Sequence, residues 1–353
     1  MFVYVGSYTE APLGSARGIE QFRFDAESGV LLPVQTITGV ANPSFLTLDE
    51  TRRVLYAVNE LDEGRVSAHV LDHETSTWRL LNQQSSHGAA PCYISLDPSW
   101  QYAFVANYSG GTVAVLPIAE DGGLGPATHV VHHESAGVRP EQEAPHPHMI
   151  APTPDGRLVL VTDLGIDQIL VYKLDTESGQ LVPNDEGTRV LTTDPGSGPR
   201  HFAFAPNGRY LYVINELGST ASVYAYDSQQ KEFQVLQTLS TLPPDFTGKN
   251  SCAHIAVSPD GRFVYGSNRG HDSIVIWAVD DERGELTLVG HEATQGQTPR
   301  NFAIDPTGSW LLVANQDSDS IVPFQRDQRT GTLSLGVSIT DTPSPVAIVF
   351  AQE

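Results

Sequence analysis

Two turn signals recur along the sequence and predict an all-β fold, a seven-bladed β-propeller. The first is a tight turn of the Pro-Asp-Gly type between two apolar stretches, which recurs about every 50 residues. The second is an Asp followed by a Gly-containing turn, and it comes after a third stretch rich in β-formers. Dividing 353 residues by seven gives about 50 residues a copy, enough for four short strands.

The first turn signal has five clear copies and one degenerate copy. They are Asp97-Pro98-Ser99, Pro154-Asp155-Gly156, Pro206-Asn207-Gly208, Pro259-Asp260-Gly261 and Pro306-Thr307-Gly308, with Glu50 in the degenerate copy. Nine residues beyond each anchor stands a small polar residue: Asn59, Asn107, Asp163, Asn215, Asn268 or Asn315. This constant offset predicts a second strand of constant length, with the polar side chain capping its end.

The second turn signal brings the number of repeat copies to seven. It is clear at Asp25, Asp175, Asp281 and Asp327, and looser near Asp72, Glu120 and Asp227. No stretch of comparable length has helical periodicity with caps. Residues 1–353 are therefore expected to form a single propeller domain.

The two ends of the chain hold the pieces of one split copy. The chain begins with a second strand, residues 2–6, and Ser7 stands where the polar cap belongs. It ends with residues 345–350, which have the character of a lone first strand. We expect the last blade to take its inner strand from the C-terminus and three strands from residues 2–38, which hides two open sheet edges.

Composition constrains partners and compartment. The net charge of −22 and the pI near 4.7 disfavour nucleic acid and acidic membranes as partners. The sequence shows no basic leader followed by an apolar run, so a cytoplasmic protein is expected, as a monomer or small homo-oligomer. Two distant cysteines, Cys92 and Cys252, predict neither a disulfide framework nor a zinc site.

The repeat also predicts which residues share one end of the ring. Residues equidistant from a hairpin turn face each other, so fixed offsets from the anchors mark the open ends of the hairpins. Six before the anchor are Ser44, Cys92, His148, Arg200, Ala253 and Arg300; five before are Phe45, Tyr93, Met149, His201, His254 and Asn301; ten after are Glu60, Tyr108, Leu164, Glu216, Arg269 and Gln316. Three arginines, three histidines and Glu216 are thus expected at one mouth, beside the long links 134–147 and 242–251.

The cations at this mouth favour a small anionic ligand. The expected substrate-binding residues are Arg269, Arg300, His201, His254 and Asn301, with Arg200 close by. Arginine grips carboxylate or phosphate with forked donors. Structural roles compete with this interpretation, since a lone Arg at a strand end is usually an ion-pair partner and a repeated backbone hydrogen bond would also explain the two equivalent histidines.

Three residues are predicted to be catalytic. His148, the one rim histidine without a repeat counterpart, is expected to titrate near neutrality and to transfer protons. Glu216 is expected to orient it or to share the base role. The reverse assignment, with Glu216 as the base and His148 as the acid, stays open, because the sequence does not separate the two. Arg200 is expected to steady an oxyanion. No cofactor and no metal are expected, because no His/Asp/Glu cluster has a metal-ligand spacing.

Several motifs together resemble the seven-bladed lactonase family. They are His146-Pro147-His148, Gly-x-Gly-Pro-Arg-His at 196–201, Asn215-Glu216-Leu217, Asn268-Arg269 and the run at 297–301. The family includes propeller-type 6-phosphogluconolactonases and fungal 3-carboxy-cis,cis-muconate lactonising enzymes. The resemblance covers essentially the whole chain and implies His148, Arg200, Glu216 and Arg269 as site residues.

The resemblance implies a hydrolase that opens a sugar lactone. The expected reaction converts 6-phospho-D-glucono-1,5-lactone to 6-phosphogluconate, in the oxidative pentose phosphate pathway. A cycloisomerase acting on a carboxymuconolactone is one alternative. A non-catalytic interaction propeller is another, although the sequence has no Trp-Asp dipeptide of the common interaction repeat.

Overall fold

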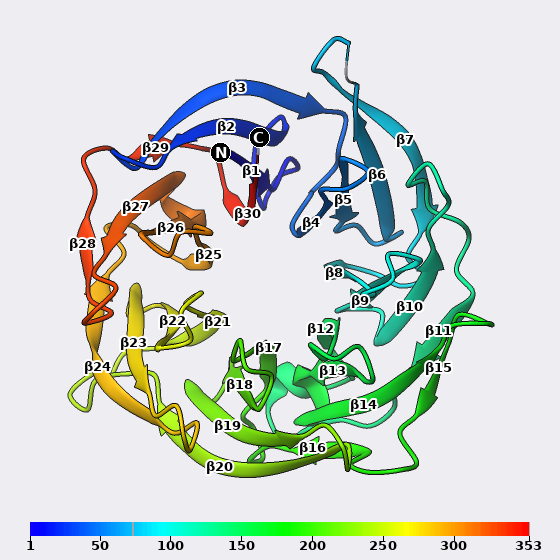
Figure 1. The fold of residues 1–353 in the computed structure, drawn as a ribbon, viewed down its shortest axis with the longest axis vertical. Helices are drawn as coiled ribbons and strands as arrows, with labels where there is room; N and C mark the ends of the chain where they lie inside the picture. The colour runs from blue at the N-terminus through cyan, green and yellow to red at the C-terminus, as the bar shows by residue number, and fades with distance from the viewer. Residues whose placement is uncertain (73, 353) are drawn as a thin grey trace.

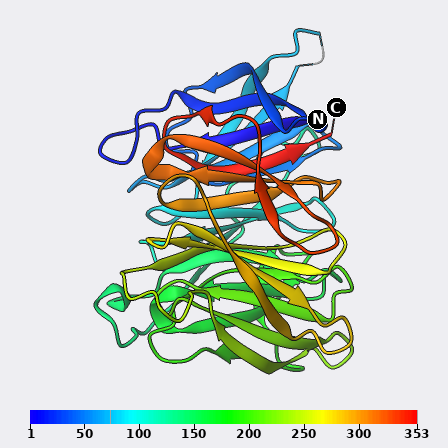
Figure 2. The ribbon, with the colours of Figure 1, turned by 90° about the vertical axis from the view of Figure 1, so that its left-hand side faces the viewer.

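The computed structural model describes residues 1–72 and 74–352 and confirms the seven-bladed propeller. Within these residues, seven antiparallel sheets stand in a ring around a central axis (Figure 1). The side view shows that the strands run from one face of the ring to the other, so that the connecting turns collect at the two faces (Figure 2). No helix among the described residues is long and apolar enough to cross a membrane.

Six blades are built from strands that follow one another along the chain. The strands of each blade are given from the axis outward. Blade one holds β4 (Leu46–Asp49), β5 (Val54–Asn59), β6 (Arg65–Leu71) and β7 (Trp78–Ser85), and blade two holds β8 (Pro91–Leu96), β9 (Tyr102–Asn107), β10 (Thr112–Pro117) and β11 (His129–His132). Blade three holds β12 (Pro147–Pro152), β13 (Val159–Asp163), β14 (Gln168–Asp175), and β15 (Gln180–Pro183) with β16 (Val190–Thr192), and blade four holds β17 (Pro199–Phe204), β18 (Tyr210–Asn215), β19 (Thr220–Asp227) and β20 (Glu232–Ser240). Blade five holds β21 (Ser251–Val257), β22 (Phe263–Arg269), β23 (Ser273–Val279) and β24 (Leu286–Ala293), and blade six holds β25 (Pro299–Ile304), β26 (Trp310–Asn315), β27 (Ser320–Arg326), and β28 (Leu333–Leu335) with β29 (Thr340–Asp341). Three short 3-10 helices lie in the links: η1 (Pro140–Gln142), η2 (Leu164–Ile166) and η3 (Gln316–Ser318).

The seventh blade joins the two ends of the chain, as the split repeat predicts. Its inner strand is β30 (Pro345–Ala351), which pairs antiparallel with β1 (Phe2–Ser7). β2 (Gly18–Asp25) and β3 (Val30–Thr38) follow outward. The N and C labels accordingly lie side by side in Figure 1.

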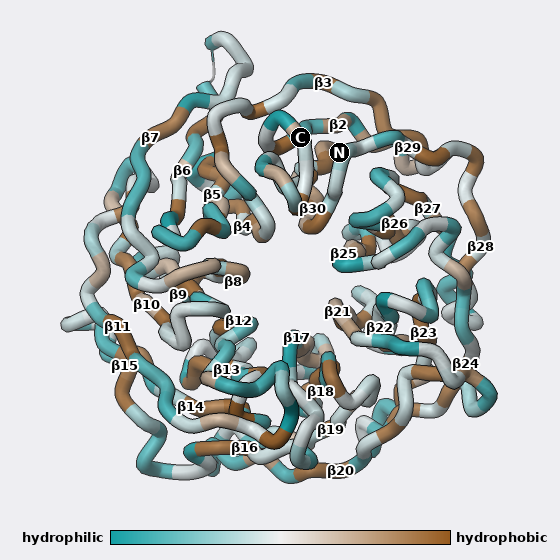
Figure 3. Tube along the Cα trace, turned by 180° about the vertical axis from the view of Figure 1, so that it is seen from behind, coloured by the Kyte–Doolittle hydropathy of each residue, from teal (hydrophilic) through white to brown (hydrophobic). Residues whose placement is uncertain are grey.

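The core lies between neighbouring blades. The second strand of a blade is covered on both faces, so it is a continuous buried run such as β5 rather than an alternating one. Each apolar cluster joins two blades; one, for example, packs Tyr212 and Ile214 against Val264 and Trp277. Hydrophobic stretches in Figure 3 accordingly fall mostly within strands. At roughly 1.5–3 kcal/mol for each large buried side chain, this packing makes the ring a rigid frame.

The polar residues that end the second strands act mainly as caps. The amide Nδ2 of Asn59 donates to Ala41 O at 2.9 Å, and Asn268 donates in the same way to Thr241 O at 2.9 Å. Both carbonyls belong to the link from the preceding blade, so each cap fastens one blade to the next. The asparagines are structural, as expected from their regular spacing.

Candidate active site

A β-bulge near the start of five inner strands shapes the mouth of the channel. In β17, Pro199 pairs with Asn215 and His201 with Ile214, so Arg200 has no partner in the register. The same irregularity falls at Cys92, His148, Arg300 and Val346. A bulge re-aims side chains, and at Arg200 and Arg300 both the bulged residue and the next one line the channel. The channel is lined there by Ser44, Phe45, Cys92, His148, Arg200, His201, Arg300, Asn301 and Val346.

Glu216 joins two of the predicted arginines. Its Oε2 lies 2.7 Å from Arg200 Nε and its Oε1 lies 2.8 Å from Arg269 Nη2. Burial alone would raise the pKa of the Glu216 carboxyl, but Arg269, Arg200 and Arg300 outweigh it and hold the pKa below its ordinary value. Glu216 is therefore an ion-paired carboxylate whose observed partners are arginines, not His148.

Backbone carbonyls fix the same two arginines from the other side. Arg200 is only 2% exposed and donates from Nη1 to Ala253 O at 2.5 Å. Arg269 donates from Nη2 to Cys252 O at 2.8 Å. Burial lowers the pKa of Arg200 to about 9 against the opposing effect of Glu216, so its guanidinium stays charged at neutral pH. These two cations have little freedom to move.

Arg300 is held differently. Its guanidinium carbon lies 5.6 Å from the centre of the Tyr8 ring, a cation–π arrangement. Among the described residues it forms no hydrogen bond and no ion pair. Burial opposes its charge, but Tyr8, Glu60 and Glu216 raise the pKa of Arg300, so it stays a cation. Its donors are therefore available to a ligand.

Tyr8 is a mouth residue that the sequence analysis missed. Its hydroxyl lies 3.0 Å from both carboxylate oxygens of Glu60. A signal for it existed: Ser7 occupies the capping position of the split copy, and Tyr8 comes directly after it, as Glu60 comes after Asn59. The N-terminal copy has no turn anchor of its own, so it was not counted in the ring.

His148 is buried at the axis and is neutral at pH 7. Burial, followed by the charges of Arg200 and Arg300, lowers the pKa of His148 well below its ordinary value. The prediction that this residue titrates near neutrality is therefore wrong, because two cations crowd a desolvated imidazole. Its Nδ1 lies 3.7 Å from the sulfur of Cys92.

The other two histidines contact each other. His201 Nδ1 lies 2.9 Å from His254 Nδ1, so one imidazole donates and the other accepts. Burial and Arg200 lower the pKa of His254 to about 3, and they also hold the pKa of His201 well below its ordinary value. A side-chain pair, rather than a repeated backbone bond, accounts for their equivalent positions. His201 also packs against His148, with ring centres 5.1 Å apart.

Asn301 has a structural contact of its own. Its Oδ1 accepts a hydrogen bond from Ile348 N at 3.1 Å, which ties β25 to the closing strand β30. The side chain still lines the channel beside Arg300. The structure thus brings all eight predicted site residues to one mouth.

Aspartates in left-handed backbone conformation hold the segments that lead to the arginine-bearing strands. Asp167, with φ of 57°, accepts from Gly196 N at 2.7 Å and Gly198 N at 2.8 Å, just before Arg200. Asp272 accepts from Thr298 N at 2.9 Å, just before Arg300. Asp319 does the same for Ser344 N at 2.7 Å, before the channel residue Val346.

The segment before His148 has a different anchor. Asp163 replaces the capping asparagine of the other copies and accepts from His146 N at 2.7 Å. Its second oxygen lies 2.7 Å from His133 Nδ1. The carboxylate therefore accepts where the asparagines donate, and it fastens the long link that carries His146.

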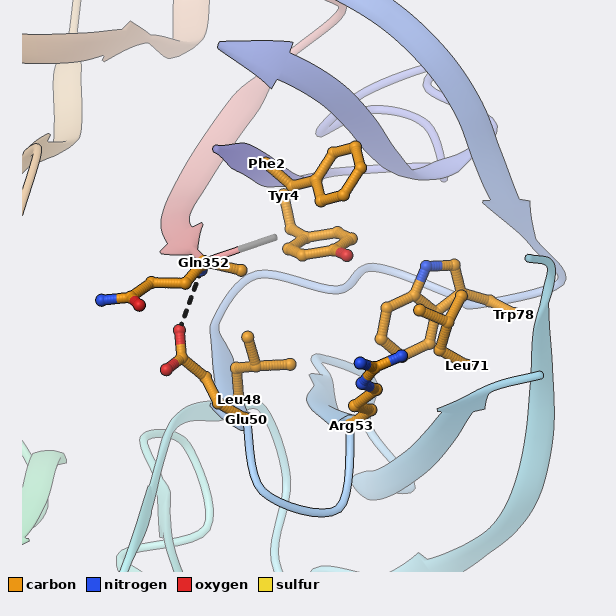
Figure 4. A pocket seen from close by; sticks show the side chains of 9 residues that line it. Phe2, Tyr4, Leu48, Glu50, Arg53, Leu71, Trp78 and Gln352 are labelled. Atoms are coloured by element: carbon orange, nitrogen blue, oxygen red, sulfur yellow. Dashed lines mark hydrogen bonds between the residues drawn. The ribbon is translucent and has the colours of Figure 1, made fainter. Parts of the chain in front are cut away.

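A second hollow lies on the opposite face, between the seventh blade and the blade of β4–β7. Figure 4 shows the rings of Phe2, Tyr4 and Trp78 lining it together with Arg53 and Glu50, whose carboxylate accepts from Gln352 N at 3.1 Å. Among the residues that the structure describes, its lining holds one arginine and no histidine. The axial mouth gathers three arginines, two glutamates and three neutral histidines, a net charge of 3 − 2 = +1 within a protein of net charge −22. Across the described part of the chain, no group of three or more His, Cys, Asp or Glu side chains is placed to hold a metal ion.

Comparison with known proteins identifies the family. The family model described as "Lactonase, 7-bladed beta-propeller" matches residues 2–350. The chain belongs to this lactonase family. This confirms the resemblance inferred from the rim motifs.

Relatives of this lactonase carry two kinds of name. A Bacillus subtilis protein named 6-phosphogluconolactonase is 36% identical over 351 residues, 99% of this chain and 98% of its own length. A Formosa agariphila protein of the same name is 35% identical over 307 residues, 85% of each chain. A solved structure described as the periplasmic gluconolactonase of Pseudomonas aeruginosa has a TM-score of 0.93 at 34% identity and covers 99% of both chains.

Proposed function

We propose that this lactonase hydrolyses 6-phospho-D-glucono-1,5-lactone to 6-phosphogluconate. The observation that carries the proposal is the mouth itself, where three arginines surround a neutral His148 in a strongly acidic protein. The names of the Bacillus and Formosa relatives support the same substrate. The proposed substrate implies a place in the oxidative pentose phosphate pathway, and we propose a cytoplasmic location for the enzyme.

His148 is the proposed proton-transfer residue. A neutral imidazole can take a proton from the water that attacks the lactone carbonyl carbon. As the tetrahedral intermediate collapses, the bond from that carbon to the ring oxygen breaks, and the imidazolium returns the proton to the ring oxygen. The pKa of His148 is low because of burial and two cations, so negative charge that develops on the substrate beside Arg200 raises it toward the working range.

Glu216 is proposed to position the arginines rather than to act as the base. A carboxylate with a lowered pKa and two ion pairs is a weak base. Its effect is to hold Arg200 and Arg269 against one carboxylate at the mouth, where a fixed cation can stabilise the developing oxyanion. Arg200 is our candidate for that role.

A direct assay tests the proposal. Acid release is followed with freshly prepared 6-phosphogluconolactone, with unphosphorylated gluconolactone and with carboxymuconolactone, each against its spontaneous rate. We expect the highest kcat/KM with the phosphorylated lactone. The Pseudomonas relative favours a second candidate, unphosphorylated gluconolactone, and a higher kcat/KM with that substrate would replace our first choice. No acceleration of any lactone would reject the function.

A further inference from the structure

The half of the mouth around Arg300 contains a polar pair without a role in the proposed reaction. Tyr8 follows β1 and Glu60 follows β5, and the two strands belong to neighbouring blades. The Tyr8 hydroxyl bridges both oxygens of the Glu60 carboxylate at 3.0 Å. The contact spans 52 residues of sequence, so it is a tertiary feature of the mouth.

Asn42 holds this pair in place. Its Oδ1 accepts from Thr9 N at 3.0 Å and Glu10 N at 3.1 Å, directly after Tyr8. Its Nδ2 donates to the backbone oxygen of Glu60 at 3.2 Å. Burial raises the pKa of Tyr8, which keeps its hydroxyl protonated and able to donate to the carboxylate. The acceptor side of the mouth is therefore as well fixed as the arginine side.

Arg300 and Glu60 are together complementary to a hydroxyl group. Both lie against Tyr8, yet in the part of the chain that the structure describes they form no ion pair with each other. A guanidinium only donates and a carboxylate only accepts, whereas a hydroxyl does both. One hydroxyl can therefore accept from Arg300 and donate to Glu60, but a ligand carboxylate placed there meets the repulsion of Glu60.

We propose that Tyr8, Glu60 and Arg300 form a subsite for the hydroxyl groups of the substrate. The substrate class is then a polyhydroxylated lactone derived from a sugar, not a carboxylated lactone such as carboxymuconolactone. This inference rests on the proposed lactonase function. It also orients the substrate, with its hydroxyl groups toward Glu60 and its carbonyl toward His148 and Arg200.

The test uses two lactones with the same six-membered ring. Glucono-1,5-lactone carries hydroxyl groups and δ-valerolactone carries none. Glu60→Gln is expected to raise KM for gluconolactone about tenfold or more, because a hydrogen bond to a charged group is lost, and to leave δ-valerolactone unchanged. Tyr8→Phe is expected to give a smaller rise on the same substrate. The control is Glu63→Gln in the same β5–β6 turn, where the side chain is 93% exposed; neither KM should change.

Equal changes on both lactones, or none in Glu60→Gln, would overturn the subsite. Thermal melting shows whether each variant folds, and if Glu60→Gln does not, Tyr8→Phe decides by the same criterion. Should the wild-type protein hydrolyse neither lactone, the subsite is judged by calorimetric binding of gluconate; the proposed function itself fails only if 6-phosphogluconolactone is not hydrolysed either. Weaker gluconate binding by Glu60→Gln supports the subsite, and unchanged binding overturns it.

Discussion

Two arginines at opposite faces of the ring, the buried Arg326 and the partly buried Arg300, differ in how many of their donors are used. Arg326 lies on the face opposite the mouth, which carries the Pro-Asp-Gly turns and is called the turn face below. It donates from Nε to the Tyr265 hydroxyl at 2.7 Å and from Nη1 to Gly308 O at 2.8 Å, while its Nη2 lies 3.1 Å from Asp260 Oδ2. At the mouth, Arg300 lies over Tyr8 without a hydrogen bond to any described residue. A cation whose donors are all used serves the fold, whereas one with open donors is available for binding.

The largest expected effect is on chemistry at the mouth. His148→Ala should lower kcat with the best lactone by about 10²–10⁴-fold, because the proton-transfer group is lost. Steady-state kinetics and a thermal melt measure the two properties separately. The melting temperature should stay close to that of the wild type. Near-normal turnover with impaired binding would mean that the mouth binds its ligand but uses another base.

On the turn face the expectation is reversed. Arg326→Met should reduce the free energy of unfolding by about 1–3 kcal/mol, because it leaves the Tyr265 hydroxyl and Gly308 O without their buried donor. Urea denaturation measures this loss. The KM and kcat of the folded fraction should be unchanged. A drop in kcat/KM without loss of stability would contradict the assignment of Arg326 to the fold and of Arg300 to binding.

Arg300→Met is the matched change at the mouth. It should raise KM by roughly 10-fold or more through loss of charge-assisted contacts, with little change in unfolding free energy, since no protein partner is stranded. The rise should be greater for the phosphorylated than for the neutral lactone if the anion reaches this arginine. A destabilisation as large as that of Arg326→Met would show that Arg300 is structural.

Falling pH should reduce the free energy of unfolding through the buried histidines of the mouth. The folded-state pKa of His254 is about 3, so below the ordinary histidine pKa of about 6.5 the unfolded chain binds a proton that the folded chain does not. Stability therefore falls with falling pH between about 6.5 and 3, by about 1.4 kcal/mol per pH unit for this group. His254→Gln should flatten the slope of unfolding free energy against pH by that amount. An unchanged slope would contradict the buried neutral state.

The smallest effect is expected from the aspartates that hold the links. Asp167→Ala frees two backbone N–H groups just before Arg200, so kcat/KM should fall several-fold. Asp319→Ala removes the same kind of contact before Val346 and is the matched control. At about 1 kcal/mol per hydrogen bond lost, Asp167→Ala should cost roughly three times the unfolding free energy of Asp319→Ala, because the Asp167 carboxylate also accepts from Gln142 Nε2. Equal losses of activity would mean that Asp167 has no positioning role.

Repetition explains how much of this molecule could be predicted. The anchors set the hairpin register, so the meeting of Arg200 with Glu216 and the pairing of β1 with β30 followed from counting. Counting residues from the turn could not predict the bulge at Arg200, because a bulge depends on where the hydrogen-bond register between the two strands shifts. It also could not set the pKa of His148, which depends on the burial and cations that converge only in the closed ring. Tyr8 was not predicted as a mouth residue, because the N-terminal copy lacks the turn anchor from which the other mouth positions follow.

The pairing of β1 with β30 has a consequence for the newly made chain. Tyr8 is synthesised well before Arg300, and the inner strand of Tyr8's own blade, residues 345–351, is synthesised after both. A chain interrupted between blade six and this strand carries His148, Arg200 and Glu216 but lacks β30. It therefore lacks the strand that pairs with β1 just before Tyr8 and that bonds to Asn301 beside Arg300. Interrupted translation yields products with an open mouth, and the mouth is completed only when β30 docks.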